Sequence, residues 1–205
     1  MDKAVQLAVT MIAACESAGI SLVHRGQRRI DTPAATSPTA FKVDELQYEL
    51  GQGPCLSAIS DEEVVYSADL AREERWDAWG PRTAEVTGIR SMLCFRLFTN
   101  EHTVGALNLY ASQPDAFDDD DRDHGLALAA HAAVAVAAAQ EADQLRIAID
   151  ARTVIGQAQG ILMERFSISP SQAFNVLVRV SSTTNTKVRD VAAELVRTRV
   201  VPGAQ

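Results

Sequence analysis

The hydrophobic pattern predicts helices and strands in mixed order over the first two thirds of the chain. Near the start, apolar residues recur at the i, i+3, i+4, i+7 spacing of an amphipathic helix, at Val5, Ala8, Val9 and Ile12. Short apolar runs predict strands at 20–24, 29–31, 64–66, 91–98 and 103–110. The last two runs flank a polar segment, 99–102, which is a hairpin signal. This order of elements predicts an α+β fold.

Turn residues separate these elements. Gly26 is expected to join the first two strands, and the Pro-containing segment 32–39 is interpreted as a loop. A Gly-x-Gly-Pro-Cys turn at 51–55 leads into a predicted short helix. A further helix is expected over 75–87, and its two tryptophans are interpreted as core or lid residues rather than as ligand-stacking ones.

A long stretch without proline, from 122 to 166, predicts one helix or two stacked ones. The acidic cluster 118–121 precedes it. We interpret this cluster as helix-capping residues rather than as a metal site, because carboxylates are favoured at a helix N-terminus. Alanine dominates the first part of the stretch, and an apolar seam continues through Leu145 and Ile149. The segment 122–150 is expected to connect two domains as a dimer-forming coiled coil or bundle; alternatively, its Ala-rich part only covers the sheet of the first domain.

Three short helices are predicted at the C-terminal end of the chain. The segment 169–172, Ser-Pro-Ser-Gln, matches a capping box with proline at the first helical position, and 183–186 ends the helix that begins there. A third helix follows, with an apolar stripe from Val188 to Val196. The three helices are expected to share one small core, to which the first helix contributes Ile155, Ile161 and Leu162.

Three small residues in the first of these helices are not explained by the apolar pattern, namely Gly156, Ala158 and Gly160. Each glycine costs about 1 kcal/mol relative to alanine inside a helix. Close approach of another backbone would explain all three. The pattern leaves open whether that backbone belongs to a neighbouring helix or to a nucleic acid.

Charge is distributed unevenly along the chain. Residues 151–205 carry seven Lys or Arg against three acids, a net +4, whereas residues 1–150 carry 12 against 24, a net −12. A basic end that follows an acidic globular part favours a polyanionic partner at that end. With 47% hydrophobic residues, the chain has enough apolar surface to bury a core and is not expected to be disordered.

The three cysteines and four histidines lack the spacing of a disulfide framework or of a metal site, so neither is expected. A reducing cytoplasm fits this cysteine usage. The segment from Ile12 to Cys15 resembles a lipoprotein cleavage site, but the amphipathic spacing before it favours a packed helix over an export signal. No run reaches the roughly 18 to 20 apolar residues that span a bilayer, so no membrane association is expected.

The C-terminal residues resemble the ANTAR domain of bacterial antitermination regulators. The resemblance rests on VIGQAQGILM at 154–163, on Ala173, Phe174 and Leu177, and on Ser181, Asn185 and 187–192. It implies a three-helix RNA-binding module. Such a module, as a dimer, stabilises stem-loops in a nascent leader transcript and so prevents a terminator from forming.

The resemblance also implies which residues touch RNA. On the first helix these are Gly156, Ala158, Gln159 and Gly160, and near the second turn they are Ser181, Asn185 and Lys187. The amides of Gln159 and Asn185 suit base readout. The charges of Arg179, Lys187 and Arg189 suit phosphates. Alternatively, Asn185 is only the left-handed residue that ends a helix, and Arg179 only a solvated charge.

One residue departs from the family pattern. The family commonly has lysine where this chain has Gln159. The missing charge should weaken attraction to phosphate, although Arg165, Arg179, Lys187 and Arg189 would compensate for it.

The first part of the chain resembles a GAF sensor domain, particularly the kind that precedes ANTAR domains in actinobacterial proteins. The resemblance rests on the order of elements and on the segments 48–58, 69–70, 75–76, 88–91 and 104–110. It implies an antiparallel sheet flanked by helices, with a pocket for a small ligand or with only a dimerising role. Phe117 and Asp118 alone do not make the cyclic-nucleotide signature, so no ligand or cofactor is identified.

Cys55 is the candidate sensor or redox residue of this part. It follows Gly53-Pro54 at the start of a predicted short helix, where a thiolate would be stabilised. The favoured alternative is a buried, inert thiol.

Together the resemblances imply a GAF-like sensor at 1–140, a helical connector at 122–150, an ANTAR module at 145–200 and a tail at 201–205. They imply a cytoplasmic, non-enzymatic regulator that forms a homodimer through the connector and binds leader-RNA hairpins. A DNA-binding helix-turn-helix regulator is a weaker alternative, because the third helix has few base-reading side chains. A second alternative is a cysteine-dependent methionine sulfoxide reductase of the GAF fold.

Overall fold

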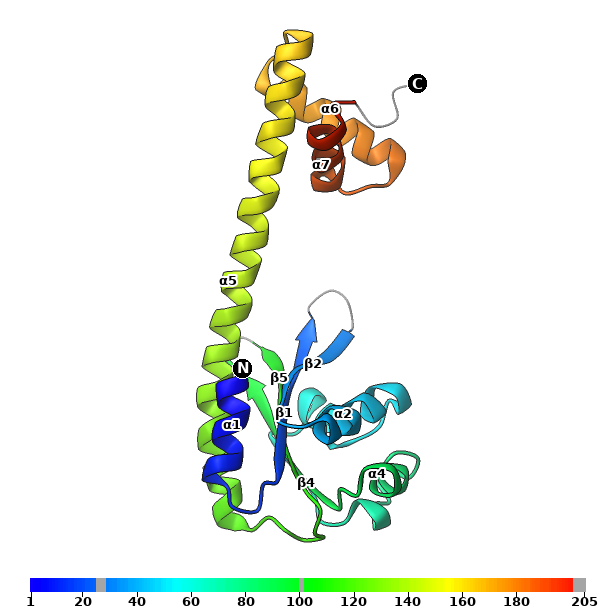
Figure 1. The fold of residues 1–205 in the computed structure, drawn as a ribbon, viewed down its shortest axis with the longest axis vertical. Helices are drawn as coiled ribbons and strands as arrows, with labels where there is room; N and C mark the ends of the chain where they lie inside the picture. Colours follow the sequence, from blue (N-terminus) through cyan, green and yellow to red (C-terminus); the bar gives the residue numbers. More distant parts are fainter. Residues whose placement is uncertain (25–28, 100–101, 201–205) are drawn as a thin grey trace. The chain divides into compact units, whose positions relative to one another are not determined.

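The computed structural model describes residues 1–24, 29–99 and 102–200. The chain forms two compact units, Met1–Ala139 and Gln140–Gln205. The first unit contains a sheet with helices on both faces, and the elements described in the second are all helices, so the predicted α+β class is confirmed. One helix, α5 (Asp119–Phe166), contributes residues to both units (Figure 1).

The sheet of the first unit is antiparallel and has five strands. Their order is β2 (Arg29–Ala35), β1 (Ser17–His24), β5 (Thr103–Ala111), β4 (Ser91–Phe98) and β3 (Val64–Ser67). Strands β4 and β5 pair from Ser91–Ala111 to Phe98–Thr103, which confirms the predicted hairpin. Gly26, predicted to join the first two strands, lies outside the described residues.

Strand β2 is longer than its sequence suggested. The segment 32–35, predicted as loop, continues the strand and pairs with β1. Proline within a run usually argues against a strand, but β2 lies at the edge of the sheet, where a missing N–H leaves no partner unsatisfied. Pro38 then begins helix α2 (Pro38–Leu50), which the loop prediction also missed; Ser37 caps it by accepting a hydrogen bond from the N–H of Ala40.

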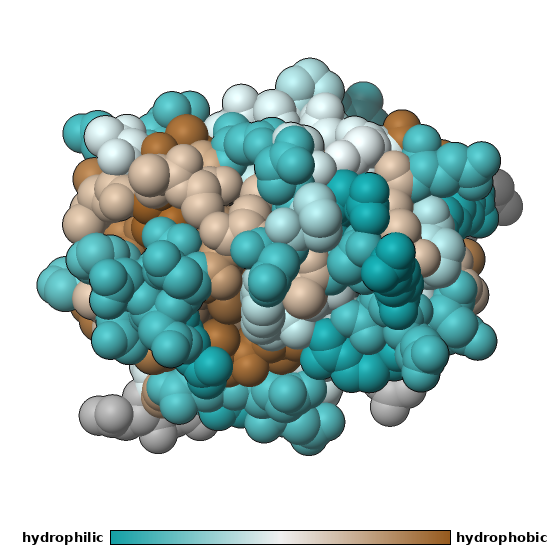
Figure 2. Space-filling model, turned by 90° about the horizontal axis from the view of Figure 1, so that it is seen from below, coloured by the Kyte–Doolittle hydropathy of each residue, from teal (hydrophilic) through white to brown (hydrophobic). Residues whose placement is uncertain are grey.

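Helix α1 (Asp2–Met11) and the first part of α5 cover one face of the sheet (Figure 1). Val5 and Ala8 of α1 are buried there, which confirms the amphipathic helix. From α5, Leu128 and Val136 pack into the same core. The Ala-rich part of α5 therefore covers the sheet. Figure 2 shows apolar residues reaching the surface on the side where Figure 1 places these two helices.

The acidic cluster marks the start of α5. The N–H of Asp121 donates to the carboxylate of Asp118 (2.9 Å), and the N–H of Asp118 donates to that of Asp121 (3.2 Å). These reciprocal bonds satisfy donors that a helix start leaves free, which confirms the capping interpretation.

Within the described chain, α5 is long and apolar enough to cross a membrane by length and composition. The sequence pattern predicts no run of that kind. The difference comes from alanine, which counts as apolar although it adds little hydrophobic surface. Because Leu128, Ala132 and Val136 of this helix pack on the sheet, the apolar composition has an explanation within the fold.

The opposite face of the sheet carries α2, α3 (Pro54–Ser60), η1 (Leu70–Arg72) and α4 (Gly80–Thr87). Helix α4 begins later than the predicted 75–87, because turns precede it and Pro81 occupies its first turn. Trp76 and Trp79 are buried core residues that meet edge to face at 6.3 Å between ring centroids.

The second unit consists of the last part of α5, α6 (Pro170–Thr184) and α7 (Val188–Thr198). Both bonds of the predicted capping box form: Ser169 Oγ accepts from the N–H of Gln172, and Gln172 Oε1 accepts from the N–H of Ser169 (2.8 Å). Leu162, Leu177 and Leu195 are buried together, one from each helix. Burying three such side chains stabilises the unit by several kcal/mol, about 1.5 to 3 for each.

Candidate nucleic-acid interface and sensor interior

The glycines of α5 differ in their surroundings. A Cβ at Gly125 would lie 2.1 Å from the ring of Phe95, so packing on the sheet requires this glycine. A Cβ at Gly156 or Gly160 would meet nothing within 4 Å. Within the described chain, no neighbouring helix accounts for these two glycines, and both leave bare backbone at the surface.

Ala158 has the opposite environment. It is fully buried against residues such as Leu162 and Leu177. The prediction that it is an exposed RNA contact is wrong for this reason. Its small side chain is explained by close packing of the three helices, whereas the glycines two residues before and after it face outward.

The polar residues expected to touch RNA hold the turns of the unit together. Gln159 Nε2 donates to the backbone oxygen of Pro170 (3.0 Å), which links α5 to the start of α6. Ser181 Oγ donates to the oxygen of Thr186 (2.6 Å) across the α6–α7 turn. Asn185 ends α6 at φ 50, ψ 37, the left-handed conformation that asparagine tolerates. Each therefore has a structural role in addition to any role in binding.

The basic candidates lie on α6 and at the start of α7. Arg179, Lys187 and Arg189 are all exposed. Arg189 Nε forms an ion pair with Asp190 (3.1 Å). Arg189, at the start of α7, borders a small pocket. The α5 residues that line this pocket lie between Ile147 and Val154, which precede Gly160 in the helix. The structure thus does not bring Arg189 and Gly160 to one pocket.

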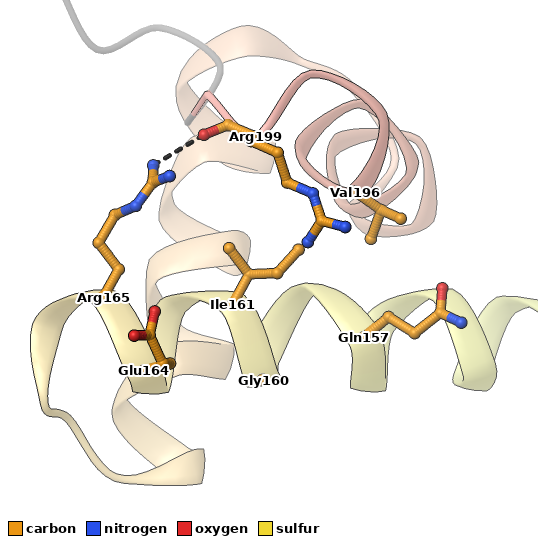
Figure 3. A pocket seen from close by; sticks show the side chains of 7 residues that line it. All are labelled: Gln157, Gly160, Ile161, Glu164, Arg165, Val196 and Arg199. Carbon is orange, nitrogen blue, oxygen red and sulfur yellow. Dashed lines mark hydrogen bonds between the residues drawn. The ribbon is translucent and has the colours of Figure 1, made fainter.

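A larger pocket lies beside Gly160 (Figure 3). Its volume is about 600 Å³, and its lining comes from α5 and α7: Gln157, Gly160, Ile161, Glu164, Arg165, Val196 and Arg199. Arg165 Nη1 donates to the backbone oxygen of Arg199 (2.7 Å). Sequence reasoning did not select Arg199 as a site residue, because 34 positions separate it from Arg165. The concentration of arginine in the last 55 residues was the only signal for it.

The interior of the first unit contains a buried carboxyl group. Asp44 of α2 is fully buried and accepts hydrogen bonds from Tyr110 Oη (2.5 Å), Thr32 Oγ1 (2.9 Å) and Asn108 Nδ2 (3.0 Å). Burial raises the pKa of Asp44 from 3.8 to about 6, although these hydrogen bonds oppose the rise. The donors come from two strands, β2 and β5, so the group ties α2 to the sheet.

Cys55 belongs to the same interior. It is fully buried, and its thiol donates to Ser21 Oγ (3.1 Å). Burial raises the pKa of Cys55 far above its usual range, and the nearby Asp44 raises it further. A thiol held protonated is a poor nucleophile, so the geometry favours the inert-thiol alternative.

The other two cysteines are also buried. Cys94 lies in the core beneath α2 to α4 with Cys55, whereas Cys15 lies in the core on the other face of the sheet. Burial raises the pKa of both thiols, that of Cys15 to about 12. The sheet thus separates Cys15 from the other two.

Comparison with known families gives two matches. A family model for the GAF domain matches residues 1–137, and one for the ANTAR domain matches residues 143–196. No curated protein matches the chain.

Solved structures resemble the first unit. A type II free methionine-R-sulfoxide reductase from Thermoplasma acidophilum is 16% identical, with 66% of this chain and 89% of that chain covered and a TM-score of 0.53. The GAF domain of an Acinetobacter phosphoenolpyruvate-protein phosphotransferase is 17% identical, with 70% and 83% covered and a TM-score of 0.54. A GAF domain from Synechocystis is 15% identical, with 70% and 94% covered and a TM-score of 0.55. At these identities the likeness establishes the fold alone.

Proposed function

Because the chain belongs to the GAF family and carries an ANTAR domain after its GAF domain, we propose that it is a non-enzymatic regulator of transcription antitermination. This domain architecture is that of a regulatory protein, and ANTAR domains bind RNA. In this proposal the ANTAR domain binds stem-loops of a leader transcript. The match of the ANTAR model to 143–196 is the observation that carries the proposal.

The proposed RNA surface combines bare backbone with positive charge. Gly156 and Gly160 expose the backbone of α5, and Arg179, Lys187 and Arg189 supply charge from the other two helices. Asn185, at the exposed α6–α7 turn, offers an amide to an unpaired base. Phosphate contacts of this kind give most of the affinity and make it depend on salt.

A homodimer through the connector is the second part of the proposal. Leu145 and Ile149 of α5 are 62% and 55% exposed. Together with Val134 and Ala138, also exposed, they recur at spacings of four, seven and four residues, as along a coiled-coil seam. A second copy of α5 would bury these side chains.

The GAF domain is proposed to sense a signal of unknown chemistry in the cytoplasm. Trp79 Nε1, Thr83 Oγ1 and Asn108 Oδ1 are buried and have no hydrogen-bond partner among the described residues. Polar atoms in such an interior would favour a small ligand that pairs with them. A ligand regulates RNA binding only if it binds one arrangement of the dimer better than another.

Binding to nucleic acid tests this proposal. We would measure the affinity of the purified protein for a two-hairpin leader RNA and for duplex DNA of matched length, at two salt concentrations. RNA-selective binding is expected, and Lys187→Ala should weaken it and flatten its salt dependence. Preference for the duplex would support the helix-turn-helix alternative instead.

The sulfoxide reductase alternative has a separate test. The burial of all three cysteines disfavours it, since a nucleophilic thiol has to reach substrate. Turnover of free methionine sulfoxide by the purified protein would establish that activity and contradict a purely regulatory role.

A further inference from the structure

The pocket beside Gly160 has an apolar floor and a polar rim. Ile161 and Val196 are half-buried and form the floor. Gly160 removes any side chain from one wall, and a Cβ there would meet open space. Packing therefore does not require glycine at this position. Glycine here nevertheless costs about 1 kcal/mol of helix stability relative to alanine.

Two arginines, Arg165 and Arg199, lie at the rim, and the side chain of Arg165 is held by a hydrogen bond. The hydrogen bond from Arg165 to the oxygen of Arg199 holds the Arg165 guanidinium beside the last turn of α7 (Figure 3). The ion pairs that the structure describes in this unit join Arg189 to Asp190 and Arg197 to Glu194. The guanidinium groups of the two rim arginines are not neutralised by these pairs.

The backbone of Arg199 is unusual for this residue type. It ends α7 at φ 60, ψ 14, a left-handed conformation where glycine is the common residue. Holding a residue with a Cβ there costs on the order of 1 to 2 kcal/mol. In return, the side chain of Arg199 lies over Ile161 toward Val196 (Figure 3). The end of α7 thus places a charged side chain at the apolar floor of the pocket.

We propose that this pocket binds one unpaired nucleotide of the RNA, an inference that rests on the RNA-binding function proposed above. The base lies over the apolar floor and stacks on the guanidinium plane of Arg199, and the phosphate contacts Arg165. Unpaired RNA bases are bound in this way, by stacking on arginine planes and by hydrogen bonds to their exposed edges. The Gln157 amide, at the same rim, offers such a hydrogen bond.

The carboxylate of Glu164 favours binding of a nucleotide over binding of a simple anion. This carboxylate belongs to the pocket and would repel a lone phosphate. Toward a base it acts as an acceptor, and it favours bases that carry an exocyclic amino group. Uracil, which has no amino group, should therefore bind least well, and Glu164→Gln should reduce that discrimination because an amide both donates and accepts.

The test compares charge-matched variants on a hairpin RNA with an unpaired loop. Arg165→Gln and Arg199→Gln should each weaken binding by about tenfold or more, as expected from loss of a stacking or phosphate contact. Arg197→Gln also removes one positive charge, from the last turn of α7, but lies outside the pocket, and should change affinity less than about twofold. Gly160→Ala should weaken binding while raising the melting temperature.

The base itself is tested with abasic loop positions. One abasic substitution should weaken binding to the native protein and have no further effect on Arg199→Gln, because both remove the same stacked pair. RNA binding by the native protein with equal effects of Arg165→Gln, Arg199→Gln and Arg197→Gln would overturn the nucleotide pocket alone. Failure of the native protein to bind any hairpin would overturn the RNA-binding function and the pocket with it.

Discussion

Tyr110 donates a hydrogen bond of 2.5 Å to the carboxyl group of Asp44, and both side chains are fully buried. Tyr110 belongs to a central strand, β5, and Asp44 to helix α2. The bond therefore joins the sheet of the GAF domain to the helices that cover one face. Burial of a carboxyl group has a cost in its charged form, which makes the domain sensitive to pH.

Stability of the GAF domain should fall as the pH rises from about 4 to about 6. The folded-state pKa of Asp44 is raised from 3.8 to about 6, so the folded protein holds the proton more tightly than the unfolded chain does. The protonated Asp44 contributes roughly 3 kcal/mol to the free energy of unfolding. This contribution is complete below the unfolded-state pKa and is lost as the pH rises through the folded-state pKa. Urea unfolding of Asp44→Asn should lack this slope. Glu45→Gln, which alters the exposed neighbouring acid, should retain it; an unchanged slope in Asp44→Asn would contradict the assignment.

No thiol should react in the folded protein. All three cysteines are buried, and burial raises the pKa of each thiol. Iodoacetamide at neutral pH is expected to leave the native protein unmodified and to label three thiols once denaturant is added, as measured by intact mass. Labelling of Cys55 under native conditions would restore the redox-sensor hypothesis.

Leu145→Glu should convert the proposed dimer into a monomer. A carboxylate in an apolar seam of two helices is poorly solvated, so association would be lost while each domain stays folded. Mass measured by light scattering after gel filtration gives the oligomeric state. Gln144→Glu adds a charge at the adjacent, exposed position and should leave the dimer intact. A dimeric Leu145→Glu protein would place the interface elsewhere.

Ser169→Ala should destabilise the ANTAR unit by about 1 kcal/mol, because it removes the acceptor of one capping bond. Urea unfolding followed by the circular dichroism of the helices measures this loss as a lower free energy of unfolding. Ser182→Ala, an exposed position in the same helix, should be neutral or stabilising, since alanine has the higher helix propensity. Equal effects of the two variants would show that the cap contributes nothing.

Side-chain burial inside the ANTAR helix was harder to predict than the helix itself. Gly156, Ala158 and Gly160 formed one group of small residues in the sequence, yet the structure buries Ala158 and leaves both glycines open. Successive residues of a helix are rotated by about 100° about its axis. Ala158, two positions from each glycine, therefore lies on nearly the opposite face of the helix. The spacing gave no way to decide which face met the other helices.

The sequence by itself determined the local elements of the ANTAR unit. The capping box at Ser169, the left-handed residue Asn185 and the helical period of α7 are signals contained within a few residues. The GAF and ANTAR resemblances were also present in short motifs. Local hydrogen bonds and side-chain period suffice for such features, because no distant residue is needed to form them.

Only the tertiary structure brought distant residues into one place. Thr32, Asp44 and Tyr110 meet in the GAF interior, and Arg165 meets Arg199 across 34 positions of the chain. The burial that raises the pKa of Asp44 depends on the packing of α2 against the sheet, and the pocket depends on how α7 lies along α5. Contacts of this kind follow from the packing of whole elements, so no pattern within one segment specifies them.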